Sequence, residues 1–236
     1  MKILITGATG LIGTAISDLC REKGWSVNYL TTDKAKIKNA SDYRGFYWEP
    51  NANKIDTNCF DGVNAIINLA GSSIGKRWTK TYKKQIISSR INSLRTLHSA
   101  LEKLNLKEKI SIISASAIGI YPDSLSNFYT ENETKIDQSF LGEVTEIWEK
   151  EIDKFQELNC TITKIRIGLV LSSKGGALPN MAKSVRMYLG SSFGSGKQWQ
   201  SWIHVHDLAR MFLFAIENNL SGVYNGVAPN PVTNSK

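Results

Sequence analysis

The sequence has few cysteines, few prolines and no cluster of metal ligands. Its three cysteines, Cys20, Cys59 and Cys160, lie far apart, and none forms a Cys-x-x-Cys pair. An odd number of widely spaced cysteines argues against a disulfide framework and against a structural metal. With 5 prolines, 18 glycines, 42% hydrophobic and 21% charged residues, the composition excludes collagen-like, disordered and coiled-coil chains.

Long apolar runs are also absent. No run approaches the roughly 18 residues that a membrane-spanning helix needs. The first seven residues lead directly into strand-like sequence and lack the longer apolar stretch of a signal peptide. We therefore expect a cytoplasmic protein with no membrane partner.

Positive charge is in excess, with 29 Lys and Arg against 21 Asp and Glu and a net charge of +8. These cations are dispersed along the chain, which favours a solvated basic face or attraction for a small anionic ligand over a nucleic-acid surface. We expect a small-molecule substrate and no nucleic-acid partner. The sequence leaves the oligomeric state open.

Short apolar segments rich in β-branched residues alternate with segments of helical periodicity. The expected strands are 2–6, 27–30, 45–48, 65–69, 110–114, 161–167 and 202–207, and the expected helices are 12–24, 79–104, 141–155, 178–189 and 207–218. This alternation predicts a Rossmann-like α/β fold, in which helices cover both faces of a doubly wound parallel sheet. We expect residues 1–175 to form the nucleotide-binding domain and residues 176–236 a small substrate-side extension packed on it.

A glycine turn, Gly7-Ala8-Thr9-Gly10-Leu11-Ile12-Gly13, connects the first strand to the first helix. Glycines at these places allow a tight turn, a close approach to a pyrophosphate and close packing of the helix. The helix N-terminus then offers free N–H groups and a positive dipole to the phosphates. The position of the turn between a strand and a helix is the context that a dinucleotide site requires.

The end of the second strand selects the cofactor in folds of this kind. A carboxylate there binds a ribose 2′-hydroxyl and repels a 2′-phosphate. Asp33 could therefore serve NAD, whereas Thr31, Thr32, Lys34 and Lys36 could serve NADP. Hydroxyls at the strand end followed by lysines favour NADP, with NAD as the alternative.

Several motifs resemble those of the short-chain dehydrogenase/reductase superfamily, and together they are similar to its atypical branch of epimerase family, or sugar-nucleotide-epimerase-like, proteins. The motifs are the glycine turn with Thr6, Asn68-Leu69-Ala70-Gly71, Ser114-Ala115-Ser116-Ala117, Lys76-Arg77-Trp78, Ser89-Arg90-Ile91, Trp148-Glu149, Arg166-Ile167-Gly168, Gly194-Ser195-Gly196, Trp202-Ile203-His204 and Asn225-Gly226-Val227-Ala228-Pro229. Members of that branch continue into a small C-terminal segment. The resemblance therefore implies that this chain is truncated and that its substrate-side region is incomplete.

The resemblance also implies which residues hold the cofactor. Pyrophosphate contacts fall on the glycine turn, the adenosine ribose on the hydroxyls of the second strand, and the nicotinamide side on the motif that ends the strand at 110–114. Arg90 and Arg166 stand in family motifs, and for Arg90 a surface ion pair is the alternative role. The expected cofactor-binding residues are Gly7, Thr9, Gly10, Leu11, Ile12, Gly13, Thr31, Thr32, Leu69, Ala70, Gly71, Arg90, Ser114 and Arg166.

The catalytic pattern of the superfamily is only partly present. Related reductases use a Ser, a Tyr and a Lys four residues after the Tyr, and the Tyr shuttles a proton to or from the substrate oxygen. Ser116 occupies the Ser position, but the Tyr and Lys positions fall on Phe140 and Val144. Tyr121 is the nearest phenol that could substitute, although a loop tyrosine more commonly packs against its neighbours.

These observations favour an NADP(H)-dependent oxidoreductase or epimerase that acts on a small hydroxylated or sugar-nucleotide-like substrate through Ser116 and Tyr121. The loss of the Tyr/Lys pair keeps open an alternative, a non-catalytic NADP(H)-binding regulator or scaffold. His204 and His206 would share one face of a strand, but a third ligand is missing, so we expect no metal site.

Overall fold

A single mixed sheet organises the molecule. The computed structural model describes residues 1–105, 108–188, 190–191 and 194–235. Eight strands lie in the order β11–β7–β6–β5–β1–β2–β3–β4, and all neighbours are parallel except β3 and β4. Their bounds are β1 (Lys2–Thr6), β2 (Ser26–Thr31), β3 (Tyr43–Glu49), β4 (Lys54–Ile55), β5 (Ala65–Asn68), β6 (Ile110–Ala117), β7 (Cys160–Ile167) and β11 (Gly222–Gly226).

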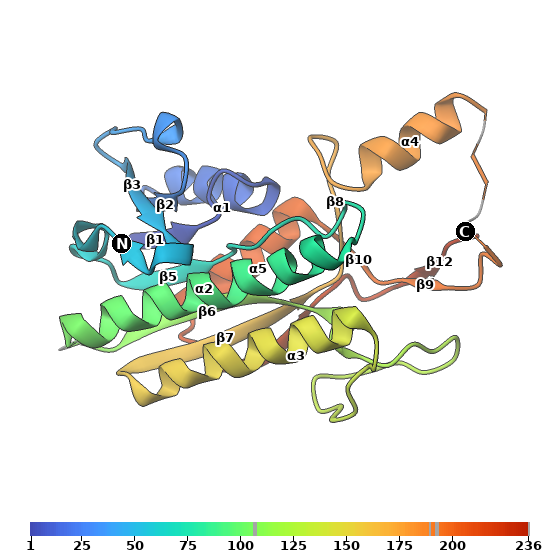
Figure 1. Cartoon of the computed structure of the whole chain (residues 1–236). Helices are drawn as coiled ribbons and strands as arrows, with labels where there is room; N and C mark the ends of the chain where they lie inside the picture. The colour runs from blue at the N-terminus through green and yellow to red at the C-terminus, as the bar shows by residue number, and fades with distance from the viewer. Residues whose placement is uncertain (106–107, 189, 192–193, 236) are drawn as a thin grey trace.

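Four helices cover the two faces of this sheet (Figure 1). Helices α1 (Leu11–Glu22) and α5 (Val205–Glu217) pack together over one face, and α2 (Lys80–Leu104) and α3 (Phe140–Asp153) pack over the other. Single 3-10 turns lie between the larger elements: η1 (Lys34–Lys36), η2 (Pro50–Ala52), η3 (Thr57–Phe60), η4 (Ile118–Ile120) and η5 (Lys154–Glu157).

Smaller elements gather at one end of the sheet, where the carboxyl ends of the strands lie (Figure 1). They are α4 (Leu178–Arg186) and two small strand pairs, β8 (Leu169–Leu171) with β10 (Trp202–His204) and β9 (Trp199–Gln200) with β12 (Val232–Thr233). The described part of the chain has no helix that is both long and apolar enough to cross a membrane.

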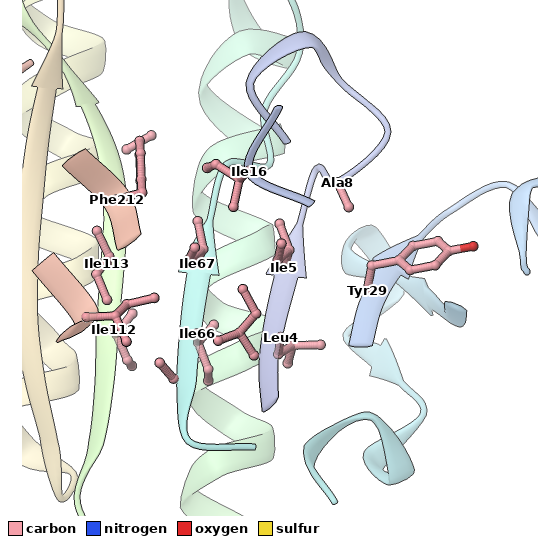
Figure 2. Close-up of a cluster of buried hydrophobic side chains, with 14 of the residues drawn as sticks. Leu4, Ile5, Ala8, Ile16, Tyr29, Ile66, Ile67, Ile112, Ile113 and Phe212 are labelled. Carbon is pink, nitrogen blue, oxygen red and sulfur yellow. The ribbon is translucent and has the colours of Figure 1, made fainter. Parts of the chain in front are cut away.

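The central strands are buried on both faces, which explains their uninterrupted apolar sequence. Leu4 and Ile5 of β1, Ile66 and Ile67 of β5, and Ile112 of β6 are at most 1% exposed. Figure 2 shows these side chains beside Ile16 from α1 and Phe212 from α5. The two faces of the core therefore hold β1, β5 and β6 in place, and with them the loops that leave these strands.

The direction of the crossovers reverses between β1 and β5. The chain leaves β1 through α1 toward β2 on one side, whereas β5 lies on the other side of β1 and leads through α2 to β6. A crevice opens at the carboxyl ends of the strands at such a switch point, and ligands bind there in open α/β sheets. The glycine turn follows β1, and Leu69–Gly71 follows β5, so both lie at this crevice.

The predicted Rossmann-like fold is confirmed, and most predicted elements agree with the structure to within a few residues. The predicted strand 202–207 is wrong in its second half, because β10 ends at His204 and α5 begins at Val205. His204 caps this helix by accepting a hydrogen bond from the backbone N–H of His206, and both histidines are exposed. They therefore do not alternate along one strand.

Two other differences concern the C-terminal part. The helix predicted over 178–189 ends at Arg186, and residue 189 lies outside the described residues. Strand β11 was not predicted, and it pairs in parallel with β7 at the edge of the main sheet. The division at residue 175 stays a prediction; α5 and β11, which follow it, belong to the same layered structure as the residues before it.

Candidate functional site

The glycine turn is closely packed. Gly7 has φ of +72°, a left-handed conformation that favours glycine. A Cβ added to Gly13 would lie 2.3 Å from the carbonyl oxygen of Gly7 and 2.6 Å from Cα of Ala8. The turn therefore requires glycine at both positions, because α1 and the turn approach each other to backbone contact.

The N-terminus of α1 is open to an anion. Gly10 is its N-cap and supplies no side-chain oxygen, and the first turn contains no acidic residue. The first backbone N–H to bond back into the helix is that of Thr14, which donates to the Gly10 carbonyl at 2.9 Å. The N–H groups of the first turn, with the positive end of the helix dipole, thus form the kind of site that holds phosphate.

Buried hydrogen bonds fix the ends of the three central strands relative to one another. Thr6 Oγ1 donates to Asn68 Oδ1 at 2.9 Å, and Asn68 Nδ2 donates to Ser114 Oγ at 3.0 Å. Thr6 Oγ1 also accepts the backbone N–H groups of Leu69 and Ala70. All three polar side chains are fully buried. They position the Leu69–Gly71 segment beside the glycine turn, and Ser114 acts here as a member of this network.

A cavity of about 350 Å³ lies next to the turn and collects many of the predicted adenosine-side residues. Its lining includes Gly7, Thr9, Thr31, Thr32, Asp33, Lys36, Ala70 and Gly71. The Asp33 carboxylate caps η1 by accepting the N–H of Ala35 at 3.0 Å and lies 3.9 Å from Nζ of Lys36. Asp33 is thus engaged within its own loop.

Arg90 of α2 lies beside this cavity without an acidic partner among the described residues. Its guanidinium donates to the carbonyl oxygens of Ser72 and Ile86 at 3.2 and 3.0 Å and packs over the ring of Trp148. Burial lowers the pKa of Arg90. Arg90 packs against Gly71, and within the part of the chain that the structure describes it does not form the surface ion pair considered for it.

A buried ion pair joins α3 to β7. Arg166 donates from Nε and Nη2 to the two carboxylate oxygens of Glu149, both at 2.9 Å. Ser116, at the end of β6, donates its hydroxyl proton to Glu149 Oε1. Ser116, Glu149 and Arg166 are 3%, 7% and 7% exposed. The predicted Ser116 and Arg166 therefore share one carboxylate that sequence reasoning had not assigned a role.

The cluster continues to Tyr121. Arg166 Nη1 donates to Tyr121 Oη at 3.0 Å, and Tyr121 donates its own proton to Oδ1 of Asn225 at 2.6 Å. We call Ser116, Tyr121, Glu149, Arg166 and Asn225 the Arg166 cluster. It brings together both predicted catalytic residues and draws on three strand ends, one helix and the loop that follows η4.

Both members of the ion pair stay charged. Burial alone would raise the pKa of Glu149, but hydrogen bonds from Arg166 and Ser116 and the charges of Arg166 and Lys164 hold it below its ordinary value. Burial alone would lower the pKa of Arg166, but its bonds to Glu149 and Tyr121 raise it above the ordinary value. Tyr121 therefore faces a permanent guanidinium cation.

Phe140 and Val144, the residues that the resemblance aligns with the usual Tyr and Lys positions, both lie in α3. Phe140 is the first residue of α3 and packs edge-on against Trp78, with ring centroids 5.3 Å apart. Val144 is buried within the same helix. Neither side chain can transfer a proton.

Tyr121 also lines a second cavity, of about 490 Å³, on the same edge of the sheet. Its lining includes residues that follow β6, residues that follow β11, and Trp199 of β9. We call it the Tyr121 cavity. The edge thus carries a glycine-turn cavity and a Tyr121 cavity, an arrangement suited to a dinucleotide and a second small molecule.

Comparison with known proteins identifies the family. The profile of the NAD dependent epimerase/dehydratase family matches residues 3–144 and 160–226. The chain belongs to this family. As an epimerase family chain it is 35% identical over 233 residues to "Epimerase family protein SA0724" of Staphylococcus aureus, and 36% identical over 233 residues to "Epimerase family protein YfhF" of Bacillus subtilis. Each match covers 98% of this chain and 76% of the relative.

Solved structures agree with this assignment. The human epimerase family protein SDR39U1, crystallised with NADPH, superposes with a TM-score of 0.82 at 29% identity and covers 100% of this chain and 77% of that one. A nucleoside-diphosphate sugar epimerase from Corynebacterium glutamicum gives a TM-score of 0.83 at 30% identity, covering 100% of this chain and 48% of that one. The resemblance inferred from the motifs is confirmed, as is NAD(P)-binding, epimerase-like character.

Two residues of the cluster, Glu149 and Asn225, were missing from the predicted site. Both belong to the family-like motifs Trp148-Glu149 and Asn225-Gly226. A buried glutamate on the apolar face of an amphipathic helix was the available signal, because a buried carboxylate requires a partner. The motifs gave the position of the partner only after the fold had placed β7 beside α3.

Proposed function

We propose that this chain is an NADP(H)-dependent oxidoreductase or epimerase of the short-chain dehydrogenase/reductase type that acts on a small hydroxylated substrate. The observation that carries the proposal is the glycine turn: Gly7 and Gly13 leave no space for a Cβ, and the uncapped, acid-free N-terminus of α1 faces the crevice. These features fit a pyrophosphate, held by Thr9 and by Gly10, Leu11 and Ile12 at the start of α1. When bound, the nicotinamide supplies or accepts the hydride.

The second-strand loop supports NADP over NAD. Asp33, the residue that would bind a 2′-hydroxyl, is engaged in capping η1 and lies near Lys36. Thr31 and Thr32 line the same cavity, and Lys34 lies nearby over the ring of Tyr47. The Thr32 hydroxyl and the lysine ammonium groups are donors of the kind that a 2′-phosphate accepts from, whereas the Thr31 hydroxyl is engaged with the backbone of Asp33. The human relative carries NADPH in its crystal structure.

We expect NADPH to bind at least about tenfold more tightly than NADH, because the 2′-phosphate gains charge-assisted hydrogen bonds. Parallel titrations by tryptophan fluorescence and calorimetry measure both affinities. The Gly10→Ala variant is expected to weaken NADPH binding by about tenfold or more, since its methyl group narrows the approach to the helix N-terminus. Gly75→Ala is the control, because its added Cβ comes no closer than 3.5 Å to Ser73 Oγ. Equal affinity of the wild type for both cofactors would contradict the NADP assignment.

For the chemical step, we assign proton transfer to Tyr121. Its phenol proton, which Asn225 Oδ1 accepts in the structure, turns to the substrate oxygen and is transferred to it in one direction, and it returns in the other. Arg166 then stabilises the phenolate through the hydrogen bond it donates, the task that the lysine performs in related enzymes. For Ser116 to orient the reacting oxygen, its hydroxyl has to turn from Glu149 to the substrate, while Glu149 keeps Arg166 beside Tyr121.

Turnover tests this assignment. We expect Tyr121→Phe to lower kcat by about 100-fold or more, because general acid–base groups contribute on this scale. Ser116→Ala should lower kcat as well, because it removes the group assigned to orient the reacting oxygen. Tyr224→Phe is the matched control, since this half-buried tyrosine of β11 donates to the carbonyl oxygen of Ser221 and is not part of the lining of the Tyr121 cavity among the described residues. The rate of NADPH oxidation with a panel of carbonyl compounds is the measurement. Undiminished turnover in both variants would remove Ser116 and Tyr121 from the mechanism.

A second candidate function is a non-catalytic NADP(H)-binding regulator or scaffold. Phe140 and Val144 at the usual Tyr and Lys positions favour it, because neither can transfer a proton. This alternative predicts tight NADPH binding without oxidation of the cofactor by any member of the panel. The same titration and turnover assays therefore separate the two functions.

A further inference from the structure

The Tyr121 cavity has an unusual charge for a protein of this composition. The chain carries a net charge of +8, yet the charged side chains that line this cavity, among the described residues, are Asp123 and Asp137. No lysine or arginine of the described chain joins the lining. Arg166 contacts Tyr121 but is paired with Glu149 on two hydrogen bonds. A diphosphate group would therefore meet carboxylates here and lack the cations that recognise it.

The helix that begins at this cavity does not supply an anion site either. Ser139 caps α3 by accepting the N–H of Gly142, and the Asp137 carboxylate accepts the N–H of Ser139 at 3.0 Å. Glu143 adds a second carboxylate in the first turn. The positive end of the α3 dipole is thus already balanced by acidic groups, in contrast to the acid-free start of α1.

Four aromatic side chains also line the cavity. Tyr121 stacks on Tyr129 with centroids 5.6 Å apart and an interplanar angle of 7°. Phe128, 72% exposed, packs against Trp199 at 5.4 Å, and the Trp199 indole donates to the Leu125 carbonyl at 2.9 Å. This bond holds β9 against the loop that follows β6. Four rings around one cavity, two of them partly open to solvent, form a surface that gains free energy by covering a flat apolar or weakly polar ring.

From these observations we infer that the Tyr121 cavity binds an uncharged, phosphate-free compound that carries a ring and a carbonyl or hydroxyl oxygen, and that it excludes nucleoside-diphosphate sugars. The inference rests on the proposed function and narrows its substrate. The ring lies against the Tyr121, Tyr129, Phe128 and Trp199 side chains, and the oxygen reaches the hydroxyl of Tyr121. Asp123 and Asp137 repel the diphosphate of a sugar nucleotide.

Calorimetric titration of the whole chain with two probes tests the inference, in the absence and in the presence of saturating NADPH. The probes are 4-methoxyacetophenone, an uncharged aryl ketone, and UDP-glucose. We expect the ketone to bind at least about tenfold more tightly than UDP-glucose. The carboxylates of Asp123 and Asp137 repel the diphosphate, and no cation among the described lining residues offsets this repulsion. Asp123→Lys is expected to strengthen UDP-glucose binding and to change ketone binding by less than about twofold, because the ketone carries no charge.

Variants locate the bound ketone. Trp199→Ala and Phe128→Ala are each expected to weaken ketone binding by about tenfold, the scale of one lost aromatic contact. Phe214→Ala is the control, because Phe214 is an exposed aromatic residue of α5 outside the cavity. Circular dichroism shows whether either variant has a folding defect. If one of them has, the other still reports on ketone binding.

Each remaining outcome overturns the inference. UDP-glucose binding as tightly as the ketone would show that the cavity accepts a diphosphate. Absent ketone binding, or ketone binding that is unchanged in both Trp199→Ala and Phe128→Ala, would show that the rings do not form the site. A failure of NADPH to bind would instead contradict the proposed function, and it leaves the ketone result on the free chain to decide the inference separately.

Discussion

The Glu149→Ala variant is expected to lose about 3–5 kcal/mol of unfolding free energy, the cost of leaving one charge of a buried pair without its partner. Arg166 donates two hydrogen bonds to Glu149, and both residues are 7% exposed, so water cannot replace the carboxylate without rearrangement. Ser116 loses its acceptor in the same variant. Urea unfolding followed by tryptophan fluorescence gives the change in midpoint and slope.

Glu146→Ala provides a matched control in the same helix. Glu146 pairs with Lys150 one turn later at the surface, where Lys150 is 70% exposed. Exposed pairs of this kind contribute about 0.3–0.5 kcal/mol. A loss in Glu149→Ala no larger than that in Glu146→Ala would show that the buried pair is not a structural anchor. In the double variant Glu149→Leu with Arg166→Met, most of the stability should return, because no unpaired charge remains.

The contribution of the Glu149–Arg166 ion pair to stability should also depend on pH. The folded-state pKa of Glu149 lies below its ordinary value, so its contribution to stability is complete above the unfolded value of about 4.3 and is lost as the pH falls through the lower folded pKa. The wild type should therefore lose more stability than Glu149→Gln as the pH falls below about 4.3. Glu151, whose pKa is also lowered in the fold by Lys154 and Arg95 despite its burial, remains in both proteins and cancels in the comparison. Parallel stability curves would contradict the role assigned to Glu149.

The fold could be predicted from the sequence because each strand, helix and turn has its signal within a short stretch of consecutive residues. The segments that contain Leu4, Ile5, Ile66, Ile67 and Ile112 are continuous apolar runs, since both faces of each central strand are covered. The glycine turn was predictable for the same reason: seven consecutive residues contain the strand end, the turn and the helix start. Asn68 and Ser114, which fix these strand ends, lie in motifs that the sequence also displayed.

The Arg166 cluster could not be assembled in this way. Tyr121 and Asn225 are separated by 104 positions, and they meet because β11 adds to the edge of the sheet beside β7. Strand β11 contains Gly222, Asn225 and Gly226, which have weak strand propensity, so pairing with β7 rather than local preference creates it. For His206 the deciding interaction is a cap: the His204 side chain accepts its N–H and starts α5 where alternation had suggested a strand.

Close packing at the glycine turn predicts that substitution of Gly13 lowers both the stability of the fold and the binding of NADPH. We expect Gly13→Ala to destabilise the fold by about 2–3 kcal/mol and to abolish NADPH binding at concentrations that saturate the wild type. The added methyl group would lie 2.3 Å from the Gly7 carbonyl oxygen and 2.9 Å from the Ala8 carbonyl carbon, so the backbone of the turn itself has to move. The roughly 1 kcal/mol that alanine gains over glycine within a helix is too small to offset this overlap.

Gly10→Ala separates the two consequences, because it lies in the same turn and its Cβ would meet only the Gly7 carbonyl oxygen, at 3.3 Å. Its unfolding free energy should stay within about 1 kcal/mol of the wild type, the usual cost of alanine at an N-cap, while NADPH binding falls. Gly13→Ala should lose both, because α1 can no longer pack against the turn that positions its N-terminus. Native stability in Gly13→Ala would show that the helix can move away from the turn. Native NADPH affinity in the same variant would show that the N-terminus of α1 does not hold the pyrophosphate.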